Sequence, residues 1–160
     1  GYIHSWDELE WIDGAREAVA RLTEDGWLLF VATNQSGVAR GYYTESDVQL
    51  LHEQMNSSFR ELGGNITKFF YSPHLPGAPV KKYDVVCDCR KPAPGMIIRA
   101  INEYNLPKDQ VFLFGDSDRD IKAAEAAGIK GFLFDGTNLK DFVYQKLAGL
   151  GYRDNGKEDI

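Results

Sequence analysis

Two apolar segments end in polar residues that could bind a phosphate and a hard cation. The run at residues 27–32 continues into Thr33-Asn34-Gln35-Ser36-Gly37, and the run at 111–114 continues into Gly115-Asp116-Ser117-Asp118-Arg119-Asp120. A hydroxyl with free backbone N–H groups can hold a phosphate, and clustered carboxylates suit a cation such as Mg²⁺. Each pattern alone also fits an ordinary turn or an acidic helix N-terminus. Their combination is more specific, because phosphate and Mg²⁺ are commonly handled together.

A third candidate, Arg90-Lys91-Pro92, closes a long loop that we expect over residues 72–94. Arginine presents a planar fork of donors to substrate oxygens, and lysine supplies a point charge to a phosphoryl group. Two solvated cations before a turn would be the alternative interpretation. The loop holds five of the six prolines and both cysteines, and loops of this length inside compact domains are usually functional.

The elements that must position these residues alternate along the chain. We expect strands at 27–32, 68–71, 111–114 and 131–134, and helices at 14–23, 44–62, 95–104, 118–127 and 139–147. Thr44 and Asp47 fit a capping box at the start of one helix. This alternation predicts an α/β fold, a Rossmann-like three-layer α/β/α sandwich with a mainly parallel sheet. Ligands of such sheets bind beyond the carboxyl ends of the strands.

Length and composition narrow the class further. The chain has 160 residues and a net charge of −6, which suits one domain, placed at residues 1–148, followed by a loose polar tail at 149–160. The acidic balance argues against a protein that grips nucleic acid or a membrane surface. No apolar run approaches the roughly 20 residues of a membrane helix, and the first residues are not a signal peptide. We therefore expect a cytoplasmic protein.

The two cysteines, Cys87 and Cys89, are separated by one residue. This spacing is poorly suited to a bond between them, because a disulfide needs particular Cα separations and dihedral angles. We expect no disulfide here, and metal binding becomes the question for this segment.

Together, the runs 33–41 (TNQSGVARG), 87–92 (CDCRKP) with 94–96 (PGM), and 115–116 (GD) resemble the haloacid dehalogenase (HAD) phosphatase superfamily. Within it they are most similar to the heptose bisphosphate and histidinol-phosphate phosphatases, over residues 1–134. The resemblance implies Mg²⁺-dependent hydrolysis through an aspartyl-phosphate, without a large cap domain. It favours a monomer acting on D-glycero-D-manno-heptose 1,7-bisphosphate, with histidinol phosphate as the alternative. Nucleic-acid ends, the substrate of more distant members, are disfavoured by the net charge.

The resemblance also assigns roles to residues. Thr33 would hydrogen-bond the transferring phosphoryl group and Lys91 would neutralise its charge, so these two are the expected catalytic residues. Asp116 would hold Mg²⁺, and Asp120 would lie next to that metal and its ligands. The same comparison places further residues in the substrate pocket: Asn34, Gln35, Ser36, Arg90 and Ser117.

The family's nucleophile and acid/base group are two aspartates that this sequence does not contain at the matching place. They lie on a strand upstream of the segment that Gly1-Tyr2-Ile3-His4 resembles. We therefore expect that strand outside the sequence given, and its absence would uncover Val31 and Leu113 at the centre of the sheet. If the chain begins at Gly1, the alternative is a protein that binds a phosphosugar without hydrolysing it.

The sequence also differs from the family pattern at a candidate zinc site. The family's long loop often carries a Cys-x-His and Cys-x-Cys tetrad, and structural Zn²⁺ prefers four such ligands. This chain has Ser72-Pro73-His74 and Cys87-Asp88-Cys89, so a hydroxyl replaces one thiolate. His74, Cys87 and Cys89 would remain as ligands of a structural Zn²⁺ that shapes the loop. A site that has lost its metal is the alternative.

Overall fold

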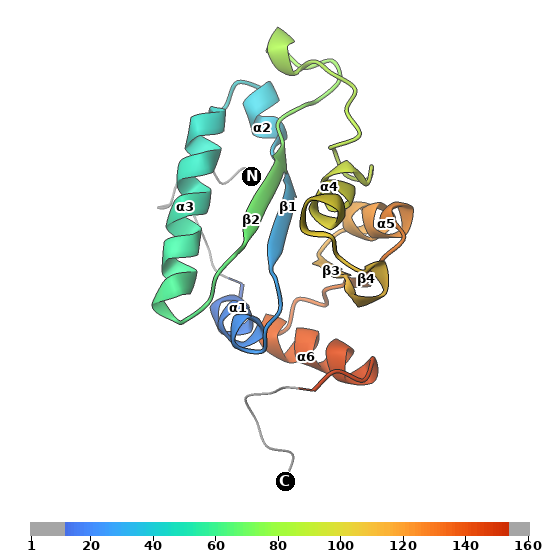
Figure 1. Cartoon of the computed structure of the whole chain (residues 1–160). Helices are drawn as coiled ribbons and strands as arrows, with labels where there is room; N and C mark the ends of the chain where they lie inside the picture. The colour runs from blue at the N-terminus through green and yellow to red at the C-terminus, as the bar shows by residue number, and fades with distance from the viewer. Residues whose placement is uncertain (1–11, 154–160) are drawn as a thin grey trace.

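The computed structural model describes residues 12–153, whose arrangement is shown in Figure 1. Helices and strands alternate as predicted. In chain order they are α1 (Ala15–Glu24), β1 (Phe30–Asn34), α2 (Ser36–Ala39), α3 (Glu45–Glu61), β2 (Lys68–Ser72), η2 (Lys81–Tyr83), α4 (Gly95–Tyr104), η3 (Lys108–Gln110), β3 (Phe112–Gly115), α5 (Asp118–Ala127), β4 (Lys130–Leu133) and α6 (Leu139–Gly149).

Helices cover both faces of the strands. Neighbouring residues of a strand point to opposite faces: Phe70 packs with Met96 of α4, whereas the Phe69 ring stacks on His52 of α3. The helix α5 contacts β3 and β4 on the α4 side, and α1 contacts both α3 and α6. The predicted three-layer α/β/α arrangement is therefore confirmed (Figure 1).

The strands form two parallel pairs instead of one continuous ladder. β1 pairs with β2, with Thr33 opposite Tyr71, and β3 pairs with β4. Within residues 12–153, no strand pairs with the second edge of β1 or of β3. Val31 and Leu113 are only half-buried, as expected for apolar residues beside an unpaired edge.

Most predicted boundaries lie within two residues of those observed, and α4 and α5 match the expected ranges. The capping box of α3 is confirmed, because Asp47 N donates to Thr44 Oγ1 and Thr44 N donates to the Asp47 carboxylate. β1 differs most. It begins at Phe30 instead of residue 27, because its ladder with β2 starts opposite Lys68.

The beginning of the expected tail packs on the domain. α6 continues to Gly149, so the boundary predicted after residue 148 falls inside this helix. Beyond it, Tyr152 N donates to Leu147 O, and the Tyr152 ring contacts Trp27 and Phe112 at centroid distances of 5.1 and 5.7 Å. Residues 154–160 of the tail, like Gly1-Tyr2-Ile3-His4, lie outside the described residues.

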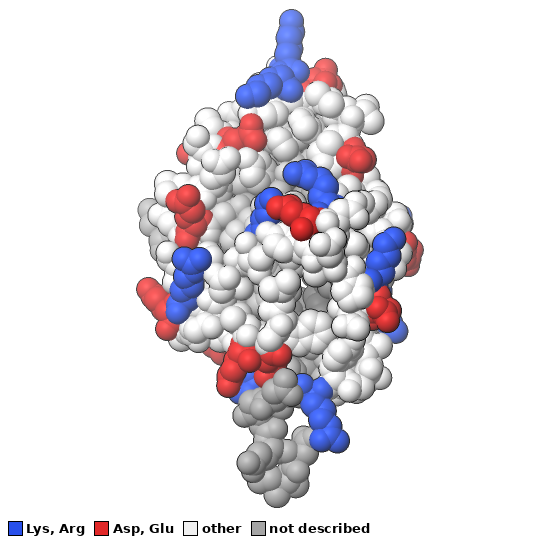
Figure 2. Space-filling model, viewed as in Figure 1, with Lys and Arg blue, Asp and Glu red and all other residues white. Residues whose placement is uncertain are grey.

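The loop at 72–94 extends beyond the carboxyl ends of β1 and β2 (Figure 1) and contains the short helix η2. Basic and acidic side chains are interspersed on the face shown in Figure 2. Among the helices of residues 12–153, none has the length and apolar character needed to cross a membrane.

Candidate active site

The carboxyl ends of β1 and β3 supply the residues predicted to bind phosphate and metal. Thr33 and Asn34 are the last residues of β1, and Gly115 is the last residue of β3. We expected these residues just after the strands, but the ladder of β1 continues until Asn34 pairs with Ser72. Asp116 follows β3 and is exposed.

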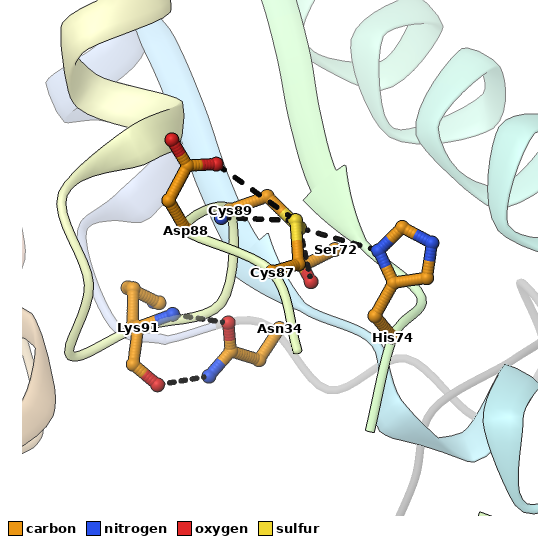
Figure 3. Close-up of a disulfide and its surroundings, with 7 residues drawn as sticks. All are labelled: Asn34, Ser72, His74, Cys87, Asp88, Cys89 and Lys91. Carbon is orange, nitrogen blue, oxygen red and sulfur yellow. Dashed lines mark hydrogen bonds between the residues drawn. A yellow bond between two sulfur atoms is a disulfide. The ribbon is translucent and has the colours of Figure 1, made fainter. Parts of the chain in front are cut away.

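Asn34 holds the Arg90-Lys91-Pro92 segment against β1. Its side-chain Nδ2 donates to Lys91 O at 3.0 Å, and its Oδ1 accepts from Lys91 N at 2.9 Å. Both bonds are drawn in Figure 3. The peptide bond between Lys91 and Pro92 is cis. Both ends of the Asn34 amide therefore bond to the backbone of Lys91 and hold that residue in position.

Lys91 connects β1 with α5, the helix that follows β3. Its Nζ donates to Ala32 O in β1 at 3.0 Å and to the Asp120 carboxylate in α5 at 2.5 Å. The two side chains are 15% and 8% exposed. Burial raises the pKa of Asp120, but the hydrogen bond and charge of Lys91, helped by Ser117, outweigh this effect and keep that pKa below its ordinary value.

Asp120 is engaged on both oxygens. While Oδ1 accepts from Lys91, Oδ2 accepts from the backbone N and the hydroxyl of Ser117 at 3.2 and 3.0 Å. Ser117 is the N-cap of α5, and the two residues form a capping box. A side chain at Gly115 would collide with Asp120, since its Cβ would lie 2.3 Å from the Asp120 Cβ. Asp120 therefore orients Lys91, whereas Asp116 and Asp118 are exposed carboxylates at this edge.

Thr33 lies at the end of a short hydrogen-bonded chain. Tyr43 Oη donates to Gln35 Oε1 at 2.6 Å, and Gln35 Nε2 donates to Thr33 Oγ1 at 3.3 Å. Gln35 is the N-cap of α2, a helix of four residues that the sequence analysis did not predict. Ser36 begins α2 and is buried. Tyr43 was also missed, because no pattern in the sequence relates it to Thr33.

Arg90 is half-buried beside Lys91 at the end of the loop. Its carbonyl accepts from Ala93 N at 2.9 Å, and Gly95 N donates to Asp88 O at 2.7 Å. The first bond closes a tight turn, and the second ties the start of α4 back to Asp88. The basic pair is thus fixed between β1 on one side and the start of α4 on the other.

The prediction that Cys87 and Cys89 do not form a disulfide is wrong. They are disulfide-bonded, with 5.1 Å between their Cα atoms, because the turn at Asp88 brings the two residues within the range that a disulfide spans. Cys89 Sγ lies 3.1 Å from Ser72 Oγ and 3.4 Å from His74 Nδ1. Dashed lines mark these contacts in Figure 3.

The same cluster has the donor atoms of a metal site. The ligand atoms of His74, Cys87 and Cys89 all lie within 4.8 Å of one another, and no other group of three or more such residues occurs in the part of the chain that the structure describes. Thiolate and imidazole are donors that Zn²⁺ favours. The sulfurs would have to be reduced, because a disulfide leaves no thiolate to bind a metal.

A cavity of about 480 Å³ lies along β2 beside the cysteine cluster. Its walls come from β2, from the loop around Cys87 and from Arg99 of α4. Thr33 and Lys91 are not among its lining residues. The candidate phosphate site is therefore a different place, at the open carboxyl edge of β1 and β3.

The loop is also tied to α3 by a group that the sequence analysis missed. Glu45 Oε2 accepts from Tyr83 Oη at 2.7 Å, and Glu45 Oε1 accepts from Tyr71 Oη at 2.9 Å. The hydrogen bond from Tyr83 lowers the pKa of Glu45, and the same bond raises the pKa of Tyr83 to about 12. Only the capping box at Thr44 indicated where Glu45 would lie, and nothing in the sequence indicated its partners.

Comparison with known proteins gives consistent matches. A family model described as HAD-hydrolase-like matches residues 88–139. A curated relative from Rhodopseudomonas palustris is 38% identical over 93% of this chain and 83% of its own length. Another from Escherichia coli is 36% identical over 94% and 83%. Both are named D-glycero-beta-D-manno-heptose-1,7-bisphosphate 7-phosphatase.

Solved structures agree with the sequence matches. The D,D-heptose 1,7-bisphosphate phosphatase of B. bronchiseptica, complexed with magnesium and phosphate, superposes with a TM-score of 0.79 at 31% identity, covering 92% of this chain and 89% of that one. A putative HAD-like phosphatase from Mesorhizobium loti gives a TM-score of 0.77 at 27% identity, over 84% and 65%.

The fold and these matches define the class: the chain is a HAD-like phosphatase. More particularly, it belongs to the family of D-glycero-beta-D-manno-heptose-1,7-bisphosphate 7-phosphatases.

Proposed function

We propose that this protein removes the 7-phosphate of D-glycero-D-manno-heptose 1,7-bisphosphate with the help of Mg²⁺. The position of the Lys91 ammonium carries the proposal. An ammonium has three N–H donors, and two of them contact Ala32 O and Asp120, which leaves the third for a phosphoryl oxygen. The names of the relatives support the sugar substrate, and the magnesium and phosphate of the B. bronchiseptica enzyme support the metal.

In this proposal, Lys91 stabilises the charge that develops on the phosphoryl oxygens. Preorganised charge of this kind lowers a barrier because nothing has to reorient during the reaction, and the Asn34 bonds to the backbone of Lys91 provide the preorganisation. The Thr33 hydroxyl donates to a second phosphoryl oxygen. Arg90, fixed beside Lys91, binds the substrate through its planar fork of donors.

Asp116 is proposed as the ligand of Mg²⁺, because it is exposed and directly follows β3, whereas the exposed Asp118 carboxylate is paired with Lys122. Bound Mg²⁺ would supply charge neutralisation at the phosphoryl group. The aspartate nucleophile that the family resemblance implies is proposed to lie on a strand between β1 and β3. Two observations support that placement: within residues 12–153 one edge of each of these strands is unpaired, and Val31 and Leu113 are half-buried.

The test is phosphate release from the heptose bisphosphate and from histidinol phosphate, measured on the full-length protein and on Lys91→Ala. We expect the heptose substrate to be preferred and kcat of the variant to fall by about 100-fold, as for loss of an electrostatic stabiliser. Lys122→Ala is the matched control, since Lys122 lies on α5 and its side chain is 63% exposed. An unchanged kcat in a folded Lys91→Ala protein would remove Lys91 from the mechanism.

We further propose that His74, Cys87 and Cys89 hold a structural Zn²⁺ when the sulfurs are reduced. The convergence of their ligand atoms supports this proposal, and Ser72 Oγ lies close enough to Cys89 Sγ to approach the same ion. The metal would shape the loop that carries Arg90 and would take no part in the chemical step.

Metal analysis of the protein purified with and without reductant tests the zinc proposal. We expect close to one Zn²⁺ per chain under reducing conditions, loss of the metal in Cys87→Ser, and tighter binding in Ser72→Cys, which restores a fourth good ligand. His52→Leu should bind as the wild type does, because this histidine lies on α3 outside the cluster. Equal zinc content in Cys87→Ser and wild type would contradict the assignment.

A further inference from the structure

We propose that Tyr43 is a positioning residue for the phosphatase reaction, which acts through Gln35 to fix the direction of the Thr33 hydroxyl. This inference rests on the proposed function, because it concerns the group that would contact the phosphoryl oxygens. The inference adds a residue that lies outside the proposed phosphate site, and it specifies which atom donates in each hydrogen bond that leads to Thr33.

Tyr43 is held firmly by its surroundings. It is 6% exposed and packs in a cluster with Val38 and Val48. Its ring lies directly over Gly37, where an added Cβ would come within 2.3 Å of the ring. A phenol packed in this way can present its Oη to Gln35 with little freedom to move.

Gln35 is fixed at both its backbone and its side chain. Its backbone N donates to Ser72 O at 2.8 Å, which ties it to the end of β2. Its Oε1 accepts the Tyr43 hydroxyl at 2.6 Å. An amide whose oxygen faces Tyr43 must direct its NH₂ group the other way, and Nε2 is found 3.3 Å from Thr33 Oγ1.

The order of donors along this chain decides what Thr33 can do. Because Thr33 Oγ1 accepts from Gln35, its own hydrogen is left to donate elsewhere. In the structure that hydrogen points to Asn34 O over a long 3.4 Å, a weak contact that a phosphoryl oxygen can replace. If the Gln35 amide were reversed, Thr33 would donate to Oε1 and lose its donor for the substrate.

A double-mutant cycle tests the inference on the full-length protein. Tyr43→Phe keeps the packed ring and removes the hydroxyl, and Thr33→Val removes the hydroxyl that Tyr43 is argued to orient. We expect Tyr43→Phe to lower kcat roughly 3- to 10-fold, the contribution of one hydrogen bond, with KM changed less than about 2-fold. In the Thr33→Val background the same substitution should change kcat less than about 2-fold, since the hydroxyl it orients is gone.

Two further variants sharpen the result. Gln35→Glu still accepts from Tyr43 but cannot donate to Thr33, so it should lower kcat as Tyr43→Phe does. Tyr42→Phe, at a neighbouring tyrosine that is 61% exposed, should leave kcat unchanged. Equal losses from Tyr43→Phe in both Thr33 backgrounds would indicate a merely structural role and overturn the inference, as would an unchanged kcat.

The same variants can also be compared without catalysis, by measuring the dissociation constant of inorganic phosphate with calorimetry. Weaker phosphate binding in Tyr43→Phe that disappears in the Thr33→Val background would support the inference even if the heptose bisphosphate were not hydrolysed, and only the proposed function would then fail. A wild-type protein that binds no phosphate and releases none would overturn both.

Discussion

Replacing Asp120 by asparagine should destabilise the protein far more than the same change at Asp118 on the same helix. Both carboxylates pair with a lysine, Asp120 with Lys91 at 2.5 Å and Asp118 with Lys122 at 3.0 Å. Their surroundings differ, because the Asp120 pair is 8% and 15% exposed and the Asp118 pair 80% and 63% exposed. The comparison therefore isolates the effect of burial on an ion pair.

Loss of one partner from a buried pair costs roughly 3–5 kcal/mol because a buried charge remains uncompensated. In Asp120→Asn the Lys91 ammonium keeps Ala32 O as an acceptor and gains an amide oxygen, so we expect about 3 kcal/mol. Asp118→Asn should cost at most about 1 kcal/mol, the worth of an exposed pair near a helix N-terminus.

Urea unfolding of the two variants and the wild type at neutral pH measures both values. The pKa of Asp120 is lowered in the folded state, so its contribution is present above the ordinary pKa of an aspartate and is lost as the pH falls through the lowered value. The difference between wild type and Asp120→Asn should shrink accordingly in acid. Equal destabilisation by Asp118→Asn and Asp120→Asn at neutral pH would refute the reasoning.

Two other titratable groups give further expectations. Burial lowers the pKa of His52 to about 4, so in acid the unfolded chain binds a proton that the folded chain does not. The free energy of unfolding should therefore fall by roughly 2.5 kcal/mol as the pH decreases from 6.5 to 4, and unfolding curves of His52→Leu should lack that fall. The hydrogen bond from Tyr83 to Glu45 raises the pKa of Tyr83 to about 12. The stabilisation from this bond should therefore be complete below pH 10 and be lost as the pH rises through 12. A pH titration of tyrosinate absorbance should show an ionisation step near pH 12 in the wild type that is missing in Tyr83→Phe.

The helices and strands could be predicted because their signals are local. The capping box at Thr44 and the apolar periodicity of α4 and α5 depend on residues within one element, and these elements were found where expected. α2 was missed because a helix of four residues has no periodicity to detect. The early start expected for β1 reflects an apolar run that continues beyond the paired residues, since Trp27 packs on aromatic rings instead of joining the ladder.

At the candidate site, the sequence indicated which residues lie near one another but not which hydrogen bonds each side chain makes. Asp120 was predicted to lie next to the metal and its ligands, and the sequence did not indicate that its two oxygens accept hydrogen bonds from Lys91 and Ser117. Tyr43 is linked to Thr33 through the amide of Gln35. Such contacts depend on the orientation of side chains at the ends of different elements, and no spacing rule reports that orientation. The Cys87–Cys89 disulfide was missed for the same reason, because a turn at Asp88 sets the distance.

The contacts around Lys91 serve the fold as well as the proposed chemistry. In the described residues no backbone ladder joins β1 to β3, so at their carboxyl edge the connection runs from Asn34 to the backbone of Lys91 and from its ammonium to Asp120. An arriving phosphoryl group would share this ammonium with Asp120. A phosphoryl group would therefore bind to an ammonium that Asp120 already holds in place. A substitution that removes the Lys91–Asp120 pair should weaken both the contact between β1 and α5 and the proposed phosphate site.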